Sequence, residues 1–150
     1  MRAALLLPLA LLAAPAMAQS APDGAAIFTR CAACHTATGA GVPGAFPPLQ
    51  SDFRTLAAKA EGRRYLALAV IKGLSGAITV QGKPYRGFMP AQPLDDASAA
   101  AVLNHVGAKI ATSGPAFKSF TPAEVAAARA GGAKLSAADV ARLHEAAGGQ

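Results

Sequence analysis

The stretch Cys31-Ala32-Ala33-Cys34-His35 decides how the rest of the chain has to be organised. Cys31 and Cys34 are the two cysteines of the sequence, and His35 directly follows the second. A C-x-x-C-H sequence is typical of covalent c-type haem attachment. Residues i and i+3 of a helical turn share one face, so both thiols can reach the vinyl groups of one porphyrin. His35 would then ligate the iron from beneath the ring.

Three other uses of this cysteine pair fit the sequence less well. A structural zinc site needs about four ligands, and the sequence holds no second cysteine pair. A thioredoxin-like redox pair follows a strand in a βαβ unit, and no strand-like run precedes Cys31. A disulfide between Cys31 and Cys34 would be strained and would close almost no loop. We therefore predict one covalently attached haem c.

Met89 is the expected second axial ligand of the iron. It is followed by Pro90 and preceded by glycine two residues earlier, which indicates a constrained loop. Met1 and Met17 are the other methionines, and both lie in an N-terminal segment that we expect to be removed. Met/His ligation raises the reduction potential of a haem. Without the upstream cysteine motif, Met89 would be interpreted as an ordinary core methionine.

The sequence offers His105 and His144 as competing ligands. His105 lies on a predicted apolar helix, where we expect it to pack as an aromatic ring. His144 lies near a polar terminus, where we expect it to be solvated. Both histidines are therefore less favoured than methionine as the sixth ligand.

The order of these motifs resembles that of class I cytochromes c, and it is closest to the bacterial domains that serve periplasmic dehydrogenases and respiratory oxidases. The resemblance covers about residues 23 to 110. It is carried by the cysteine motif, by Phe46-Pro47-Pro48-Leu49, by Tyr85-Arg86-Gly87-Phe88-Met89-Pro90 and by a helix that follows. It implies an all-α class I fold, with about three to five helices around one covalently bound haem.

The resemblance also implies roles for three further residues near the haem. A carbonyl of Pro47 or Pro48 is expected to accept the hydrogen bond of the second ring N–H of His35, which would fix the tautomer of the ligand. The sequence does not distinguish the two prolines. Tyr85 is a candidate hydrogen-bond donor to a haem propionate, and simple packing is an equally good interpretation of a single tyrosine.

Helix signals are present on both sides of the motif. We expect helices over residues 23–30, 57–72 and 94–110, with Gly73 as the C-cap of the second. A weak hairpin signal covers residues 77–86, with a turn at Gln81-Gly82. The resemblance places Gly24 and Phe28 where the first helix crosses the last one, and His105 stands where the family usually has another aromatic residue.

The sequence divides into a leader, a domain and an extension. Residues 1–18 combine Arg2, an apolar run and Ala16-Met17-Ala18, which is the pattern of a cleaved secretory signal. The apolar run is short and interrupted by prolines, so an uncleaved anchor is the less favoured alternative. Residues 19–112 form the predicted cytochrome c domain. For residues 113–150 we expect a helical or partly disordered extension, loosely attached rather than a docking arm for a partner.

Basic residues are in excess, with 14 Lys and Arg against 8 Asp and Glu. The excess concentrates between the cysteine motif and Met89, in Arg54, Lys59, Arg63, Arg64, Lys72, Lys83 and Arg86. A positive face around an exposed haem edge would attract a redox partner with an acidic docking face. Nucleic acid is an unlikely partner, because aromatic and basic residues do not alternate in this sequence.

These observations together predict a one-electron transfer protein rather than an enzyme. The haem, with His35 and Met89 as axial ligands, would serve in the periplasm as a soluble carrier or as the cytochrome subunit of a dehydrogenase or oxidase chain. Contact with a membrane would come only through a partner complex or an uncleaved signal. The main alternative is a haem enzyme or ligand sensor with an open or labile sixth position. A structural subunit with a redox-silent haem is a third.

Overall fold

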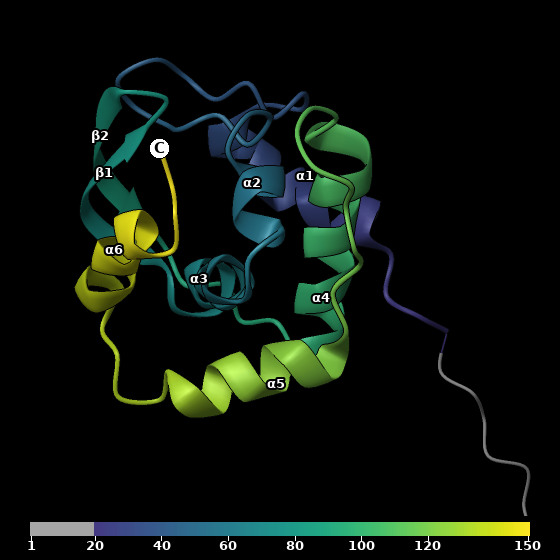
Figure 1. The fold of residues 1–150 in the computed structure, drawn as a ribbon. Coiled ribbons are helices and arrows are strands. Elements are labelled where there is room, and N and C mark those ends of the chain that lie inside the picture. The colour runs from purple at the N-terminus through teal and green to yellow at the C-terminus, as the bar shows by residue number, and fades with distance from the viewer. Residues whose placement is uncertain (1–19) are drawn as a thin grey trace, which may run out of the picture.

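The computed structural model describes residues 20–150, and the predicted signal segment lies outside this range. The helices surround α3, which lies at the centre of the molecule (Figure 1). In chain order the elements are α1 (Gly24–His35), α2 (Phe53–Ala57), α3 (Ala60–Lys72), β1 (Leu74–Val80), β2 (Lys83–Met89), α4 (Asp96–His105), the π-helical turn η1 (Val106–Ile110), α5 (Pro122–Gly131) and α6 (Ala137–Ala146).

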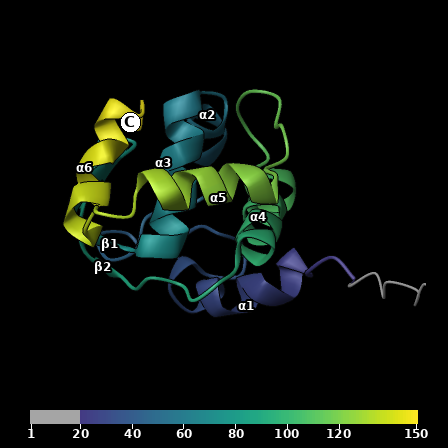
Figure 2. The same ribbon diagram turned by 90° about the horizontal axis from the view of Figure 1, so that it is seen from below.

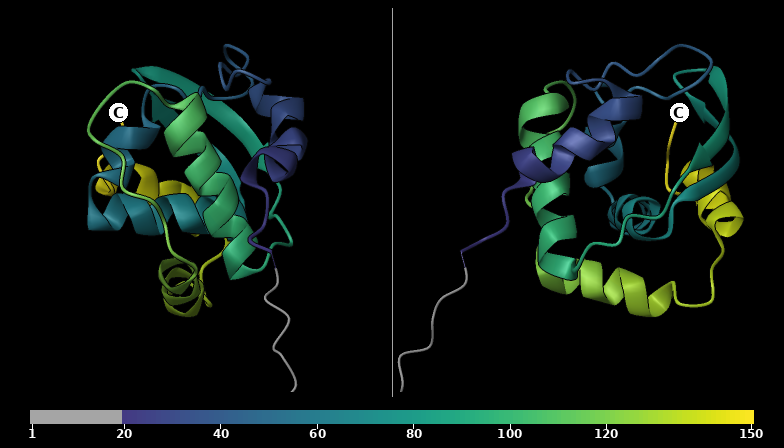
Figure 3. Two further views of the ribbon diagram at one scale, coloured as in Figure 1. Left: turned by 90° about the vertical axis from the view of Figure 1, so that its right-hand side faces the viewer. Right: turned by 180° about the vertical axis from the view of Figure 1, so that it is seen from behind.

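Helix α1 carries the cysteine motif on its last turns and crosses α4 closely. It begins where the Asp23 carboxylate accepts from the backbone N–H of Ala25 at 2.9 Å, and it continues past the predicted end to His35. A Cβ at Gly24 would lie 2.1 Å from the carbonyl oxygen of Ala101, so only glycine allows this approach. The crossing of α1 and α4 is visible from behind (Figure 3). The crossing inferred from Gly24 is therefore present.

The middle helix is shorter than predicted, because the helical conformation is interrupted at Lys59. A separate short helix, α2, precedes the break, and α3 starts at Ala60. A Cβ at Gly62 would meet the carbonyl oxygen of Leu56 at 2.0 Å, so this glycine lets α3 pack directly on α2. Gly73 ends α3 with a φ of 74°, which confirms the predicted C-cap.

A two-stranded antiparallel hairpin follows α3, in register from Leu74 opposite Met89 to Val80 opposite Lys83. Gln81 and Gly82 both have positive φ, 52° and 70°, as tight hairpin turns require. The hairpin is longer than the sequence signal indicated. It adds a small sheet to the expected all-α fold, while the separate α2 and the two helices after α4 raise the helix number above the expected range.

The C-terminal extension is helical and firmly packed, so the expectation of a loosely attached tail is wrong. Capping boxes at Thr121 with Glu124 and at Ser136 with Asp139 begin α5 and α6. Val125 of α5 and Val140 of α6 are both 0% exposed, so the apolar side of each helix is buried. Helix α5 lies across α3 and α4, and α6 lies against α3 and β1 (Figure 2).

Arg63 explains much of this packing. Its guanidinium pairs with Glu124 at 2.8 Å and donates to the carbonyls of Lys118 and Ser119 at 2.9 and 3.0 Å. It also lies over the ring of Phe120, 3.9 Å from the centroid. A cation that the sequence assigned to a docking face therefore holds the extension to α3 instead.

Replacing Glu124 with glutamine should destabilise the protein by about 1 kcal/mol at neutral pH. The hydrogen bond from Arg63 is the main cause that lowers the pKa of Glu124 to about 2. This stabilisation is present above about pH 4.5, the ordinary pKa, and is lost as the pH falls toward 2. The side chain of Glu124 is 38% exposed, so solvent screening keeps the effect small.

Chemical denaturation of wild type and E124Q at several pH values checks this prediction. The stability difference should shrink as the pH falls through the acidic range. Glu61→Gln, on the exposed face of α3, is the matched control and should have little effect. Equal stability of E124Q and wild type at neutral pH would contradict the assigned role of the ion pair.

Candidate haem site

The predicted attachment, ligand and neighbouring residues of the haem line one cavity, whereas His105 does not. The cavity is enclosed by α1, α3, the hairpin, the loop before α2 and the end of α6, together with residues of α2, α4 and η1, and its wall is mostly apolar. The sequence-predicted residues in the wall are Cys31, Cys34, His35, Pro47, Pro48, Tyr85 and Met89. Segments far apart in the sequence therefore bring the predicted attachment and ligand residues together.

The two thiols lie on the last turns of α1 and are free and half-buried. Burial raises the pKa of the Cys31 thiol, and the charge of Arg30 opposes this effect. Both sulfurs are thus held at the cavity on one helical face, with the i and i+3 spacing that covalent attachment to one ring requires. Within residues 20–150, no group of three or more His, Cys, Asp and Glu side chains is arranged to hold a metal ion.

His35 is buried at the end of α1, and its ring is fixed by one hydrogen bond. Nδ1 donates to the carbonyl oxygen of Pro47 at 2.9 Å, which answers the question left between Pro47 and Pro48. Because a carbonyl only accepts, the proton is on Nδ1 and the lone pair of Nε2 is available. Burial is the main influence on the pKa of His35 and lowers it. A neutral imidazole with a fixed tautomer is the form that binds metals.

The loop that supplies Pro47 has a defined shape. Val42 N–H donates to the carbonyl of Phe46 at 2.8 Å, which closes the loop in front of Pro47. A Cβ at Gly41 would lie 2.3 Å from the same Phe46 carbonyl oxygen, and φ there is +67°, so glycine is required. The glycine therefore lets the loop fold closely enough for Pro47 to reach His35.

Met89 is the last residue of β2 and forms part of the cavity wall. Its strand partner is Leu74, and it is half-buried. A Cβ at Gly73 would meet the carbonyl oxygen of Met89 at 2.3 Å, so the C-cap of α3 fits tightly against this backbone. After Met89 the chain is tied back to α3 by the hydrogen bond from Gln92 N–H to the carbonyl of Val70, at 2.9 Å. The end of β2 is thus fixed on two sides.

His144 is buried in the cavity wall, and the expectation that it is solvated is wrong. It is 2% exposed, and its Nε2 lies 2.8 Å from Oδ2 of Asp52, which is itself 7% exposed. The ring of Tyr65 packs edge-on against it, with centroids 5.2 Å apart. Burial raises the pKa of Tyr65, and the charge of Asp52 adds to this effect. His105, by contrast, packs against Phe28 as expected, at 5.3 Å between ring centroids.

The sequence analysis missed this buried polar pair. Asp52 and His144 are 92 residues apart, and neither belongs to a local motif. A weak signal was available in α6, whose apolar positions Val140 and Leu143 predicted a buried side next to His144. To infer from this signal that His144 is buried, one would have had to know that α6 folds back onto β1.

The donor set of this cavity fits a covalently attached haem. It offers paired thiols on one helical face, a neutral imidazole with a free Nε2 and a thioether. The surrounding wall is apolar, which suits the porphyrin. Phe46 and Phe88, which line the cavity, are 36% and 68% exposed, so the chain leaves apolar surface for a cofactor or a partner to cover. A helix-borne C-x-x-C-H stretch at such a cavity defines a c-type cytochrome.

Comparisons with known proteins agree with this class. A family model described as Cytochrome c matches residues 21–109. The chain is similar to a cytochrome c-552 of Thermus thermophilus, with 45% identity over 123 residues that cover 80% of this chain and 82% of the relative. A second cytochrome c-552 of Thermus thermophilus is 45% identical over 111 residues, 72% of this chain and 85% of the relative. The chain belongs to the cytochrome c family.

Family membership confirms three of the expectations. The protein has the class I cytochrome c fold, it carries one covalently attached haem c, and it transfers electrons through that haem. The match to the family model ends before α5, whereas the longer of the two matches to a relative covers 80% of the chain.

Proposed function

We propose that the protein is an exported one-electron carrier whose haem is attached through Cys31 and Cys34 and ligated by His35 and Met89. The observation that carries the proposal is the hydrogen bond of His35 to Pro47, which leaves Nε2 free at the cavity. When bound, the haem supplies reversible one-electron chemistry at its iron. The chain's own residues hold it, exclude water from it and tune its potential.

With both axial positions filled by side chains, no position is left for a substrate. His35 is fixed by Pro47, and Met89 lies at a point of β2 that is tied to α3 on two sides. Rigid ligands require little rearrangement when the iron changes oxidation state. This supports electron transfer, rather than catalysis or ligand sensing, as the function of the site.

We further propose that the protein works in the periplasm, either as a soluble carrier or as a cytochrome subunit of an oxidoreductase. The signal-like pattern over residues 1–18 supports export. None of the helices between residues 20 and 150 is long and apolar enough to cross a bilayer. Contact with a membrane complex would therefore involve the surface of the domain or the leader.

The proposed partner docks at the exposed apolar rim of the cavity. This rim consists of Phe46 and Phe88, which are 36% and 68% exposed. Val42, which is 42% exposed and forms a β-bridge with Phe46, extends the apolar surface next to it. Lys83 and Arg86 are exposed on β2, and Arg86 lies two residues before Phe88 on the same face of the strand. An apolar contact with basic residues at its edge suits a redox protein whose docking face is apolar at the centre and acidic around it.

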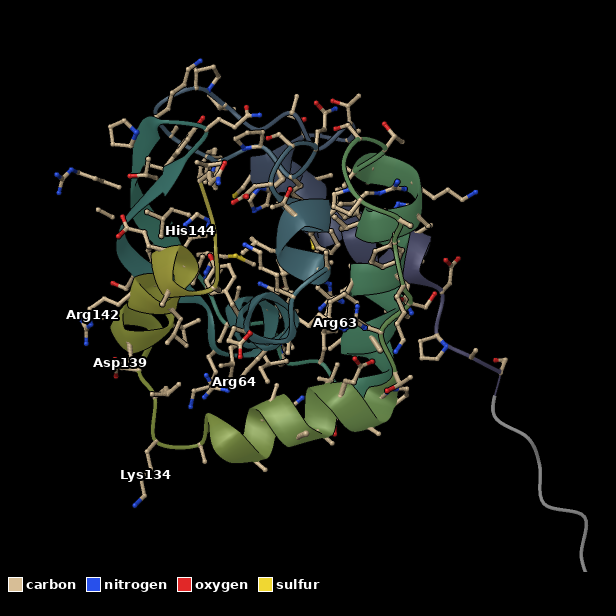
Figure 4. The ribbon with its side chains drawn as sticks, viewed as in Figure 1. Arg63, Arg64, Lys134, Asp139, Arg142 and His144 are labelled. Carbon is tan, nitrogen blue, oxygen red and sulfur yellow. The ribbon has the colours of Figure 1, made fainter. Side chains whose placement is uncertain are left out.

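Fewer basic side chains are available to a docking partner than the sequence indicated. Arg63 is bound to the extension, Arg54 donates to the carbonyl of Gly107 at 3.0 Å, and Arg64 and Lys72 donate to carbonyls of Gly131 and Ala133 at 3.3 and 3.1 Å. Figure 4 shows Arg64 between α3 and α5, and Arg63 on the side of α3 toward α4. The partner's acidic groups are thus expected to meet the hairpin rather than α3.

Exchanging Lys83 and Arg86 for glutamate should slow electron exchange with an anionic reagent by about tenfold at low salt. Hexacyanoferrate is a suitable anionic probe, and stopped-flow mixing measures the rate. The cationic probe hexaammineruthenium should react at least as fast with this double variant as with wild type. High salt should remove both effects, because it screens exposed charges.

The double variant Lys118→Glu/Lys134→Glu is the matched control for this experiment, because it changes the net charge by as much as the double variant on β2. Lys118 is exposed in the loop before α5. Lys134 is exposed in the loop between α5 and α6, where it points away from the body of the molecule (Figure 4). This variant should change the rate much less than the double variant on β2. Equal slowing by the control and the double variant would show that net charge, rather than a face at the hairpin, governs the encounter.

A further inference from the structure

Asp52 and His144 form a buried ionisable pair in the wall of the haem cavity, and neither residue is one of the proposed attachment or ligand residues. Their side chains are 8% and 3% exposed, and the Oδ2–Nε2 distance is 2.8 Å. Both residues line the cavity. His144 comes from the inner side of α6, whereas Asp139 and Arg142 of the same helix extend outward (Figure 4). The pair is therefore shielded from solvent and lies in the wall around the cofactor.

One nitrogen of the His144 ring, Nδ1, is available to accept a proton. If Nε2 carries the proton that bonds Asp52, Nδ1 is left with a lone pair. Nδ1 is buried and has no hydrogen-bond partner among the residues that the structure describes. Gly149 covers it, because a Cβ at that position would lie 2.5 Å from Nδ1. The last residues of the chain therefore lie directly over this nitrogen, and a local opening of them would let a proton reach it.

Few other ionisable groups face His144. Tyr65 faces it from α3, Asp52 from the loop before α2, and β1 has no ionisable residue. Tyr85 of β2 lines the same cavity, and Lys59 approaches the C-terminal end, where a Cβ on Gly148 would lie close to its Nζ. The raised pKa of Tyr65 keeps this phenol neutral. Arg30 also lines the cavity. Besides the basic groups of Arg30 and Lys59, the charge in this part of the wall therefore depends on Asp52 and His144.

We infer that the Asp52–His144 pair takes up a proton when the haem is reduced and releases it when the haem is oxidised. The redox partner supplies the one electron, and solvent supplies the proton. The proton adds to Nδ1 and converts the neutral imidazole into an imidazolium, while the Asp52 carboxylate stays ionised and hydrogen-bonded. This inference depends on the redox role of the haem and does not depend on Met89 being a ligand.

The direction of the coupling follows from charge. Reduction makes the cavity more negative by one unit, which favours an additional proton on a nearby group. For a separation of about 10 Å and an effective dielectric of about 20, a unit change of charge alters a proton equilibrium by roughly tenfold. Oxidation has the opposite effect. His144 should therefore keep its proton to higher pH in the ferrous protein than in the ferric one.

The reduction potential of the holoprotein as a function of pH tests the inference. In wild type, the potential should fall between two plateaus as the pH rises, by about 59 mV for a tenfold difference in proton affinity. His144→Gln keeps a donor for Asp52 without a titratable ring, and its potential should not change over this range. Asp52→Asn should shift the transition, because it removes the charge that stabilises the imidazolium. His105→Gln is the matched control and should behave as wild type.

A second readout measures the proton directly. Stoichiometric reduction in weakly buffered solution with a pH indicator should show proton uptake in wild type and in His105→Gln, and none in His144→Gln. A wild-type potential that is independent of pH, or a pH dependence that persists in His144→Gln, would overturn the inference. The visible spectrum of each variant reports axial ligation separately, so a wrong ligand assignment and a wrong proton site give different results.

Discussion

Met89→Ala should lower the reduction potential by on the order of 100 mV while the haem stays covalently attached. A thioether ligand stabilises ferrous iron, and alanine offers no replacement for it. The attachment residues Cys31 and Cys34 lie on α1, at a distance in the sequence from the substituted strand, so attachment should be preserved. Spectroelectrochemical titration measures the potential, and the mass of the denatured protein reports attachment.

Thr79→Ala is the matched control for Met89→Ala. Thr79 lies on the neighbouring strand opposite Pro84, and it is not part of the cavity wall. The reduction potential of this variant should differ from that of wild type by a few tens of millivolts at most. A shift of about 59 mV would already correspond to a tenfold change in the one-electron equilibrium constant. An unchanged potential in Met89→Ala would refute the ligand assignment.

His35→Ala should reduce the yield of stable holoprotein by roughly tenfold or more, because cofactor binding and folding are coupled in small domains. Without the imidazole, the iron loses the ligand that Pro47 orients. The chain is poor in large side chains, with 5% aromatic residues, so it depends on the haem for apolar core. Haem absorbance per exported protein measures the yield.

His105→Ala is the control for this experiment, because His105 packs against Phe28 from outside and is not itself part of the cavity wall. It should lower stability modestly and leave the haem content near that of wild type. Abundant His35→Ala holoprotein with a normal spectrum would overturn the interpretation of the whole motif.

The parts of the fold that the sequence predicted correctly are those encoded by neighbouring residues. The C-cap at Gly73 and the turn at Gln81-Gly82 each depend on a few adjacent positions. The cysteine motif is local in the same sense. For such features, steric and hydrogen-bonding requirements act within one turn of the chain, so the sequence alone determines them.

The parts that the sequence predicted poorly depend on long-range packing. Counting cations between the motif and Met89 could not show that Arg63 is bound to Glu124, 61 residues away. The same limit applies to Asp52 and His144, which have no local motif. The attached position of the extension follows from Val125 and Val140, whose burial depends on where α5 and α6 meet α3 and β1. The choice between Pro47 and Pro48 needed the position of the His35 ring.

The visible absorption spectrum of the matured holoprotein, oxidised and reduced, with and without carbon monoxide, tests the central claim most directly. A haem with His35 and Met89 as ligands should give a low-spin c-type spectrum with a sulfur-to-iron band when oxidised, and it should not respond to carbon monoxide when reduced. A high-spin spectrum, or prompt binding of carbon monoxide, would contradict the account and would favour an open iron suited to catalysis or sensing.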